Sequence, residues 1–179
     1  KIEEMGYPVF VKPTNGGSSV ATFKIKSKED IKAAVEEGLK WDTEVMIEEF
    51  VEGDEITCPV FDGKMWPVIA IKPKSDFFDY TQKYAADGAD EIVIELEEEL
   101  HKEVERMALE TYKALKCKVY ARVDMIINKK GVPYILEVNT LPGMTPASLF
   151  PKSASAKGIS YSGLLDKIIE TSLKVKRSI

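Results

Sequence analysis

Two neighbouring apolar segments of the sequence carry polar residues that could share one face of a hairpin. The segments are Val119–Ile127 and Pro133–Asn139, and they are joined around Lys129-Lys130-Gly131. Side chains alternate between the two faces of a β-strand. One face is then apolar, with Val119, Ala121, Val123, Met125 and Ile127 matched to Tyr134, Leu136 and Val138, whereas the other face carries Arg122, Asp124, Glu137 and Asn139.

The match between the apolar faces fixes the register of this hairpin. A two-residue loop at Lys130-Gly131 gives that register, and it predicts Asp124 opposite Glu137 and Arg122 opposite Asn139. Cross-strand partners lie about 4.5–5.5 Å apart at Cβ. Two carboxylates at this distance repel each other unless a cation lies between them.

A hard divalent cation would relieve that repulsion. Mg²⁺ binds oxygen ligands and is held by one or two carboxylates together with substrate phosphates. The amide oxygen of Asn139 would add a neutral ligand, and Arg122 could bind an anion on the same face. A solvated acidic face, with Arg122 in an ordinary salt bridge, also explains the spacing because charged strand faces are common.

A second group of residues is typical of a phosphate-binding loop. Lys12 ends an apolar run, and Thr14-Asn15-Gly16-Gly17-Ser18-Ser19 follows it. The backbone N–H groups of such a loop can approach phosphate oxygens without obstruction from side chains. The loop is not a Walker A motif, and simple turn chemistry also explains it. Lys83, on a long loop, is a second cation that could equally be a solvated charge.

Periodicity indicates the elements that would position these residues. Apolar residues at helical spacing predict helices over about 27–40 and 97–115 and a last helix from about Ser162. Strands are predicted at 9–11, 20–25 and 45–51, and Asp62-Gly63 is a strong hairpin signal. Residues 72–90 have no steady period and are typical of a long ordered loop, which is usually functional.

Composition excludes several classes of function. The formal net charge of −5 argues against a nucleic-acid partner, whose phosphates require a broad basic face. No apolar run is long enough for a membrane span. Cys58 and Cys117 lack metal-type spacing, so we expect reduced, buried thiols in a cytoplasmic protein with small-molecule partners. His101 lies away from every motif and is expected at the surface.

Five stretches of the sequence resemble the ATP-grasp family, and more closely its D-alanine–D-alanine ligases. They are PVFVKPTNGGSSV (8–20), IEEFVEGDE (47–55), DYTQKY (79–84), ARVD (121–124) and LEVNTLPGMTPASL (136–149). Their order and approximate separations also agree. The resemblance implies an α+β, ATP-grasp fold of antiparallel sheets with flanking helices. ATP would be held between two subdomains, namely part of the central subdomain at 1–51 and the C-terminal catalytic subdomain at 52–179.

The resemblance also implies a role for each matched residue. The residues that would bind ATP are Lys12, Glu48, Glu49, Val51, Glu55 and Lys83. The ligands of two Mg²⁺ ions, or of Mn²⁺, would be Asp124, Glu137 and Asn139. The oxyanion of a tetrahedral intermediate would be stabilised by Arg122 and Gly143. The loops over the first D-alanine would be connected by Ser18 and Tyr84, and the second D-alanine would be bound by Ser148 and Leu149.

The implied reaction joins two D-alanines through a D-alanyl phosphate and supplies a peptidoglycan precursor in the bacterial cytoplasm. Family members also have an N-terminal domain, with another ATP-binding lysine and a glutamate partner for Ser18 and Tyr84. These would precede residue 1. We therefore expect a truncated portion of an enzyme, which when complete could be a homodimer, and we expect this portion to be inactive alone.

Two other functions stay open. A ligase of the same family that joins D-alanine to a D-hydroxy acid would share most of the motifs, although Tyr84 argues against it. A non-catalytic nucleotide-binding module would need no ligation chemistry, but the intact acidic and lysine motifs argue against natural decay. Titration with ATP and Mg²⁺ would test whether the nucleotide site is functional.

Overall fold

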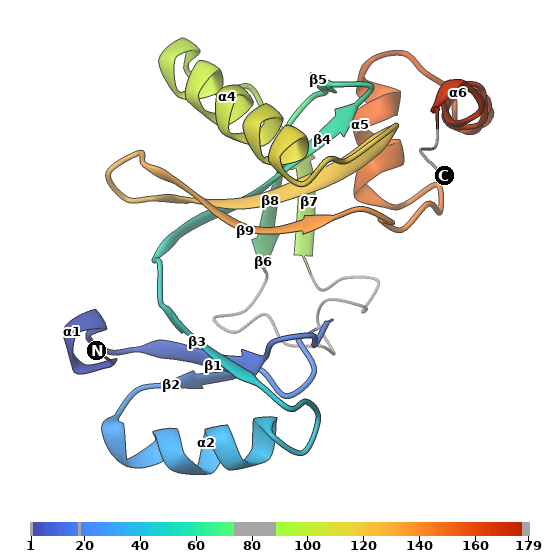
Figure 1. The fold of residues 1–179 in the computed structure, drawn as a ribbon. Helices are drawn as coiled ribbons and strands as arrows, with labels where there is room; N and C mark the ends of the chain where they lie inside the picture. The colour runs from blue at the N-terminus through green and yellow to red at the C-terminus, as the bar shows by residue number, and fades with distance from the viewer. Residues whose placement is uncertain (1, 18, 74–88, 177–179) are drawn as a thin grey trace. The chain divides into compact units, whose positions relative to one another are not determined.

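The computed structural model describes residues 2–17, 19–73 and 89–176, which form two compact units (Figure 1). Among these residues, the first unit contains the chain up to Val51 together with Pro73 and Ala89, and the second contains Glu52–Lys72 and the chain from Asp90 onward. No helix in the described ranges is long and apolar enough to cross a membrane. Most of the predicted long loop, residues 74–88, lies outside the described residues.

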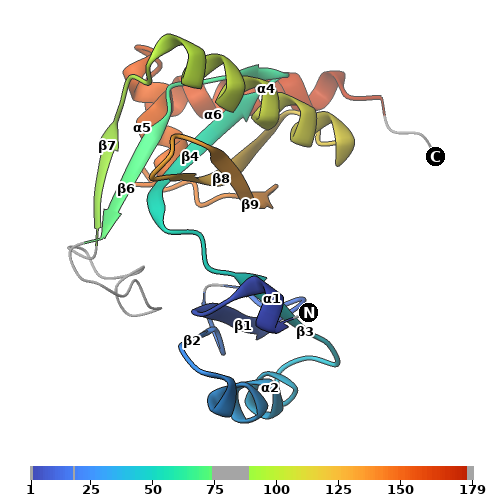
Figure 2. The ribbon, with the colours of Figure 1, turned by 90° about the vertical axis from the view of Figure 1, so that its left-hand side faces the viewer.

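The first unit is a three-stranded antiparallel sheet with a helix against one face. Its strands are β1 (Val9–Pro13), β2 (Phe23–Ile25) and β3 (Val45–Glu49), in the order β2-β1-β3. Buried residues alternate with half-buried ones along β1, and Val9 and Val11 form a core with Ala34 of α2 (Ile31–Gly38). Figures 1 and 2 show α2 along this face of the sheet. The described residues of this unit also form the helix α1 (Ile2–Met5) and the 3₁₀ turn η1 (Lys28–Asp30).

The second unit is a larger sheet in which β7, β6, β4, β8 and β9 lie side by side and β5 pairs with β4. The strands are β4 (Gly53–Phe61), β5 (Lys64–Met65), β6 (Ile69–Pro73), β7 (Ala89–Val93), β8 (Tyr120–Asn128) and β9 (Pro133–Asn139). The pairs of β4 with β5, β6 and β8, and of β8 with β9, are antiparallel. In the described ranges, the helices α4 (Glu98–Ala114), α5 (Leu149–Ala156) and α6 (Tyr161–Lys174) accompany the sheet.

Helix α4 covers one face of this sheet, and a group of polar residues on β4 and β8 points to the other face. The core beneath it joins apolar residues of three elements: Val104, Ala108 and Tyr112 of α4, Ile56, Cys58 and Val60 of β4, and Ala121, Val123 and Met125 of β8. Because side chains alternate along a strand, Thr57, Arg122 and Asp124 point to the opposite face.

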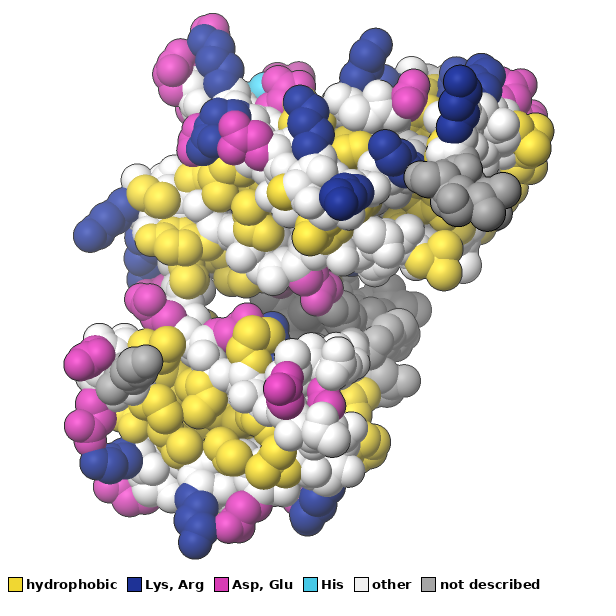
Figure 3. All heavy atoms as spheres, in the orientation of Figure 1, with side chains coloured by type: hydrophobic (Ala, Val, Ile, Leu, Met, Phe, Trp, Pro, Cys, Tyr) yellow, Lys and Arg dark blue, Asp and Glu magenta, His cyan; other side chains and the backbone are white. Residues whose placement is uncertain are grey.

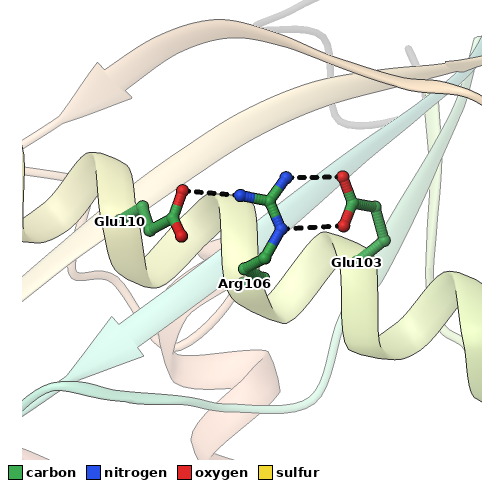
Figure 4. A network of polar contacts seen from close by, with 3 residues as sticks. All are labelled: Glu103, Arg106 and Glu110. Carbon is green, nitrogen blue, oxygen red and sulfur yellow. Dashed lines mark hydrogen bonds and ion pairs between the residues drawn. The ribbon is translucent and has the colours of Figure 1, made fainter.

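The solvent side of α4 carries charged pairs at helical spacing. Arg106 donates from Nε and Nη2 to the two carboxylate oxygens of Glu103, and from Nη1 to Glu110 (Figure 4). His101 is exposed on this helix, as predicted. Basic and acidic side chains are also interspersed over the face of the molecule drawn in Figure 3.

An aromatic cluster forms a second core in the larger unit. The ring of Trp66 lies 4.9 Å from that of Phe61 and 5.6 Å from that of Phe150, measured between centroids. Phe150 also meets Tyr120 edge-on at 5.5 Å, and Leu164 of α6 completes the cluster. These contacts fix α5 against β4. Neither α5 nor a role for Trp66 was predicted from the sequence.

The hairpin of β8 and β9 differs from the prediction at two points. Its turn contains three residues, Lys129, Lys130 and Gly131, because the N–H of Asn128 donates to the carbonyl of Val132 at 2.9 Å. Between the turn and the site, β9 has one extra residue, Leu136, since Met125 pairs with Ile135 whereas Asp124 pairs with Glu137. The expected two-residue loop is therefore wrong.

This bulge also changes which residues of β9 match the apolar face. Ile135 and Pro133 lie opposite Met125 and Ile127, whereas the prediction assigned Tyr134 and Leu136 to that face. Val138 lies opposite Val123, as expected.

Most of the other predicted elements are confirmed. The helix at 97–115 is α4, and Asp62-Gly63 forms a two-residue turn with φ values of 47° and 71°. The strand expected at 20–25 begins only at Phe23. Cys58 and Cys117 are both free thiols, although Cys117 is half-buried instead of buried.

Candidate functional site

Two rows of polar residues cross the larger sheet on the face opposite α4. In the first row, Thr57, Asp124 and Glu137 are successive Cα partners on β4, β8 and β9. In the second row, Arg122 lies opposite Asn139. The two cross-strand pairs predicted from the sequence are therefore confirmed, despite the different turn and the bulge.

Arg122 and Thr57 together hold the carboxylate of Asp124. Arg122 donates from Nε to Oδ1 and from Nη2 to Oδ2, both at 2.8 Å. The hydroxyl of Thr57 donates to Oδ1 at 2.5 Å. The side chains of Arg122 and Asp124 are only 12% and 6% exposed. The result is a bidentate, charge-assisted pair that is almost removed from water.

The positive charge of Arg122 is stabilised although its side chain is largely buried. Burial disfavours the guanidinium and lowers its pKa, but the hydrogen bonds and charge of Asp124, followed by the charges of Glu137 and Glu55, raise the pKa of Arg122 above its ordinary value. A guanidinium has five N–H donors. Asp124 accepts from only two of them, so the others can serve a further anion.

Glu137 and Asn139 are the accessible members of the two rows. Glu137 is exposed and Asn139 is half-buried, with its Oδ1 accepting from the N–H of Leu141 at 3.1 Å. The Glu137 carboxylate, a remaining lone pair of Asp124 and the second lone pair of Asn139 Oδ1 suit a hard cation such as Mg²⁺. Within the described ranges, no three His, Cys, Asp or Glu residues gather as a metal site. A cation here would therefore need further oxygen ligands, such as substrate phosphates.

The loop after β9 brings Gly143 close to the beginning of α5. Ser148 precedes this helix, and its Oγ accepts from the N–H of Thr145 at 3.1 Å. A Cβ at position 143 would lie 3.1 Å from Ser148 Oγ, so the absence of a side chain suits this close approach. The side chain of Ser148 does not cap the helix. The first N–H groups of α5, beginning at Leu149, can therefore bind an anion such as a carboxylate.

In the first unit, the predicted phosphate-binding lysine and adenine-hinge glutamate are ion-paired. Lys12 Nζ lies 2.7 Å from Glu48 Oε2, and the two side chains are 28% and 34% exposed. Glu48 is the Cα partner of Phe10 on the sheet face opposite α2. Phe10 contacts Phe50 at 5.9 Å, and Lys24 Nζ lies 3.6 Å from the centre of the Phe50 ring. Rings, cations and a carboxylate on one face suit a nucleotide.

The other predicted ATP-binding residues are distributed differently. Glu49 is the Cα partner of Val9 and so points to the face opposite that of Glu48. Val51 follows β3, and Glu55 lies on β4 in the second unit. The remaining predicted site residues, Ser18, Lys83 and Tyr84, lie outside the described residues.

Comparison with known proteins identifies the family. The family model of the D-ala D-ala ligase C-terminus matches residues 1–170. The chain belongs to this family. It is 68% identical over 177 residues to a D-alanine–D-alanine ligase of Clostridium beijerinckii, covering 99% of this chain and 59% of that protein. It is 66% identical over 176 residues to D-alanine–D-alanine ligase B of Clostridium perfringens, covering 98% and 58%. The chain thus spans about 59% of the length of such relatives.

Solved structures of D-alanine ligases share the fold. The ligase of Bacillus anthracis complexed with ATP has a TM-score of 0.85 and 48% identity, covering 97% of this chain and 55% of that one. The VanG D-Ala:D-Ser ligase of Enterococcus faecalis has a TM-score of 0.80 and 35% identity, covering 95% and 52%. The predicted α+β, ATP-grasp fold of antiparallel sheets with flanking helices is confirmed.

The contribution of Thr57 to this ligase-family site was not predicted from the sequence. Its hydroxyl is completely buried and contacts Asp124 directly. The sequence does contain one indication, namely the hydroxyl of Thr57 inside the otherwise apolar run Ile56–Phe61. A buried polar group of this kind needs a hydrogen-bond partner. That signal indicates a partner but does not identify it.

Proposed function

We propose that the chain provides ATP-binding and catalytic residues of a D-alanine–D-alanine ligase, which joins two D-alanines for peptidoglycan synthesis. The observation that carries the proposal is the pair of rows on the larger sheet, where Asp124 and Glu137 lie beside Arg122 and Asn139. Family membership and the similarity to a ligase complexed with ATP support it further. We place the reaction in the bacterial cytoplasm, where ATP is available.

The reaction has two steps, and neither requires a covalent enzyme intermediate. A carboxylate oxygen of the first D-alanine attacks the terminal phosphorus of ATP, and the bond to the bridging oxygen of ADP breaks. The amine of the second D-alanine then attacks the acyl carbon, inorganic phosphate leaves, and the amine loses a proton. Catalysis of this kind depends on positioning and on neutralising charge.

Arg122 and Gly143 would act on the second step. The oxyanion that forms at the acyl carbon would be stabilised by the free N–H donors of Arg122 and by the backbone N–H of Gly143. The carboxylate of the second D-alanine would lie at the start of α5, at Ser148 and Leu149, where the helix N-terminus favours a negative charge. Ser18 and Tyr84 would connect loops over the first D-alanine.

Asp124, Glu137 and Asn139 would hold Mg²⁺, in two ions or with Mn²⁺ as a substitute. Bound there, the metal would neutralise phosphate charge and orient the phosphoryl group. The chain's own residues set the position of that site, because Asp124 is fixed by Arg122 while Glu137 is exposed.

ATP would bind through Lys12 and Lys83 at the phosphates and through Glu48, Glu49, Val51 and Glu55 at adenine and ribose. Binding would separate Lys12 from Glu48, because phosphate and adenine are opposite ends of the nucleotide. Opening this pair costs little, since ion pairs in contact with solvent contribute about 0–1 kcal/mol.

Calorimetric titration of the chain with ATP, with and without Mg²⁺, tests the nucleotide part of this proposal. We expect binding that is strengthened by Mg²⁺, and absence of any Mg²⁺-dependent binding would refute the proposal. Phosphate release and dipeptide formation should then be measured on a longer protein that includes the remaining family domain. D-Alanine, D-serine and D-lactate as second substrates would distinguish the proposed ligase from D-Ala:D-Ser and D-hydroxy acid ligases.

A further inference from the structure

We infer that Thr57 is a positioning residue that leaves Asp124 a single oxygen with which to bind a cation. The inference rests on the proposed function because it concerns the same metal-binding face. It goes beyond that function because Thr57 is neither a predicted ligand nor a predicted substrate contact.

Thr57 lies on the central strand β4, directly opposite Asp124, and Asp124 lies directly opposite Glu137. Thr57 and Asp124 are both buried, Thr57 completely. No substrate can reach the hydroxyl of Thr57, so its effect on a ligand must pass through Asp124.

Most lone pairs of the Asp124 carboxylate already accept hydrogen bonds. Each oxygen of Asp124 offers two acceptor positions. Both positions of Oδ1 are filled, one by the hydroxyl of Thr57 and one by Nε of Arg122. One position of Oδ2 is filled by Nη2 of Arg122. A single position, on Oδ2, is left for a cation.

Removing the Thr57 hydroxyl would free one acceptor position on Asp124 Oδ1. Without the Thr57 hydroxyl, both oxygens of Asp124 would have an open position, and Arg122 alone would hold the carboxylate. Outer-shell hydrogen bonds of this kind typically contribute about 10–100-fold to metal affinity. We therefore expect Thr57→Val, which keeps the shape of the side chain, to weaken cation binding by about 10–100-fold.

The experiment measures binding of Mn²⁺ alone, by paramagnetic relaxation of water, and of Mg-ATP, by calorimetry. The variants are Thr57→Val, Thr57→Ser and the control Ser153→Ala. Ser153 is also 0% exposed and donates its hydroxyl hydrogen bond to the carbonyl of Pro67 at 2.7 Å, so its loss has a similar structural effect elsewhere. ATP binding without metal and the urea midpoint of unfolding are measured for each variant.

We expect Thr57→Val to weaken Mn²⁺ and Mg-ATP binding, with metal-free ATP binding unchanged, and Thr57→Ser to restore metal binding. Ser153→Ala should lower the urea midpoint without changing metal binding. Metal affinity of Thr57→Val equal to that of the unmodified chain, or equal losses in Thr57→Val and Ser153→Ala, would overturn the inference alone. An unmodified chain that binds Mn²⁺ but no nucleotide would refute the proposed function, and weakened Mn²⁺ binding by Thr57→Val would still support the inference. An unmodified chain that binds no cation, either alone or together with ATP, would overturn both.

Discussion

Replacing Arg122 by Met should destabilise the larger unit by about 3–5 kcal/mol, which is the usual cost of leaving one member of a buried ion pair without its partner. The side chains of Arg122 and Asp124 are 12% and 6% exposed, so water cannot replace the guanidinium easily. Asp124 would lose two of its three hydrogen bonds and keep only that of Thr57. Methionine has a similar length, so little volume is lost.

Urea unfolding followed by the fluorescence of Trp66 measures this effect. Trp66 is 6% exposed within the aromatic cluster and therefore reports on the larger unit. Trp41, in the smaller unit, is 63% exposed, and Trp41→Phe in every variant would remove its signal with little effect on folding.

Two further variants make this result specific. Arg122→Met combined with Asp124→Asn should recover most of the lost stability, because no buried charge then lacks a partner. Arg106→Met removes an arginine that pairs with Glu103 and Glu110 on the solvent side of α4. It should barely change the midpoint, because exposed ion pairs contribute little. Equal shifts for Arg122→Met and Arg106→Met would refute the reasoning.

Three other outcomes are expected. Glu137→Gln should weaken Mg²⁺-dependent ATP binding by more than about tenfold, since even an outer-shell partner of a metal contributes about tenfold to its affinity. The urea midpoint should stay the same because Glu137 is exposed. Unchanged calorimetric affinity would contradict the metal assignment. Lys12→Met should weaken metal-free ATP binding by about 10–100-fold, as expected for the loss of a charged hydrogen bond, and Lys12→Arg should weaken it less. Equal ATP affinities of Lys12→Met and the unmodified chain would exclude a phosphate contact. Burial, and to a lesser extent the charge of Asp124, raise the pKa of the Cys58 thiol far above its ordinary range, and burial raises the pKa of Cys117 as well. The thiolate is the form that reacts with iodoacetamide. At pH 8, mass spectrometry should therefore show labelling of the half-buried Cys117 first and of Cys58 only after unfolding. Comparable labelling of both thiols in the folded chain would contradict the burial of Cys58.

The hairpin shows how far the sequence alone could lead. Strand alternation was sufficient to predict that Asp124 lies opposite Glu137, because apolar residues must share a face. The turn was misjudged, since Gly131, with φ of +77°, suits a three-residue loop as well as a two-residue one. The extra residue of the bulge, Leu136, has no distinctive sequence signal. The turn and bulge errors cancel at Asp124, so its pairing with Glu137 was predicted correctly although the turn was not.

Helix α5 shows a different limit. Pro151 lies in its first turn, where a missing N–H breaks no intrahelical bond, yet proline in a sequence usually indicates a loop. The segment therefore resembled a continuation of the preceding Pro- and Gly-containing loop. Its position depends on Phe150 packing against Trp66, a contact between residues far apart in the chain. Local periodicity contains no information about such a contact.

The order of strands in the larger sheet has a consequence for synthesis on the ribosome. Strand β4 can pair with β6 soon after both emerge, but its other neighbour, β8, follows only about 60 residues later. At a translation rate of about 5–20 residues per second, this is a delay of about 3–12 s. During this interval one hydrogen-bonding edge of the central strand has no partner, and such edges invite pairing with other chains. Helix α4 is made before β8 and can already shield the apolar face of Ile56, Cys58 and Val60. Nascent chains that end between α4 and β8 should therefore be safer from aggregation than chains that end before α4.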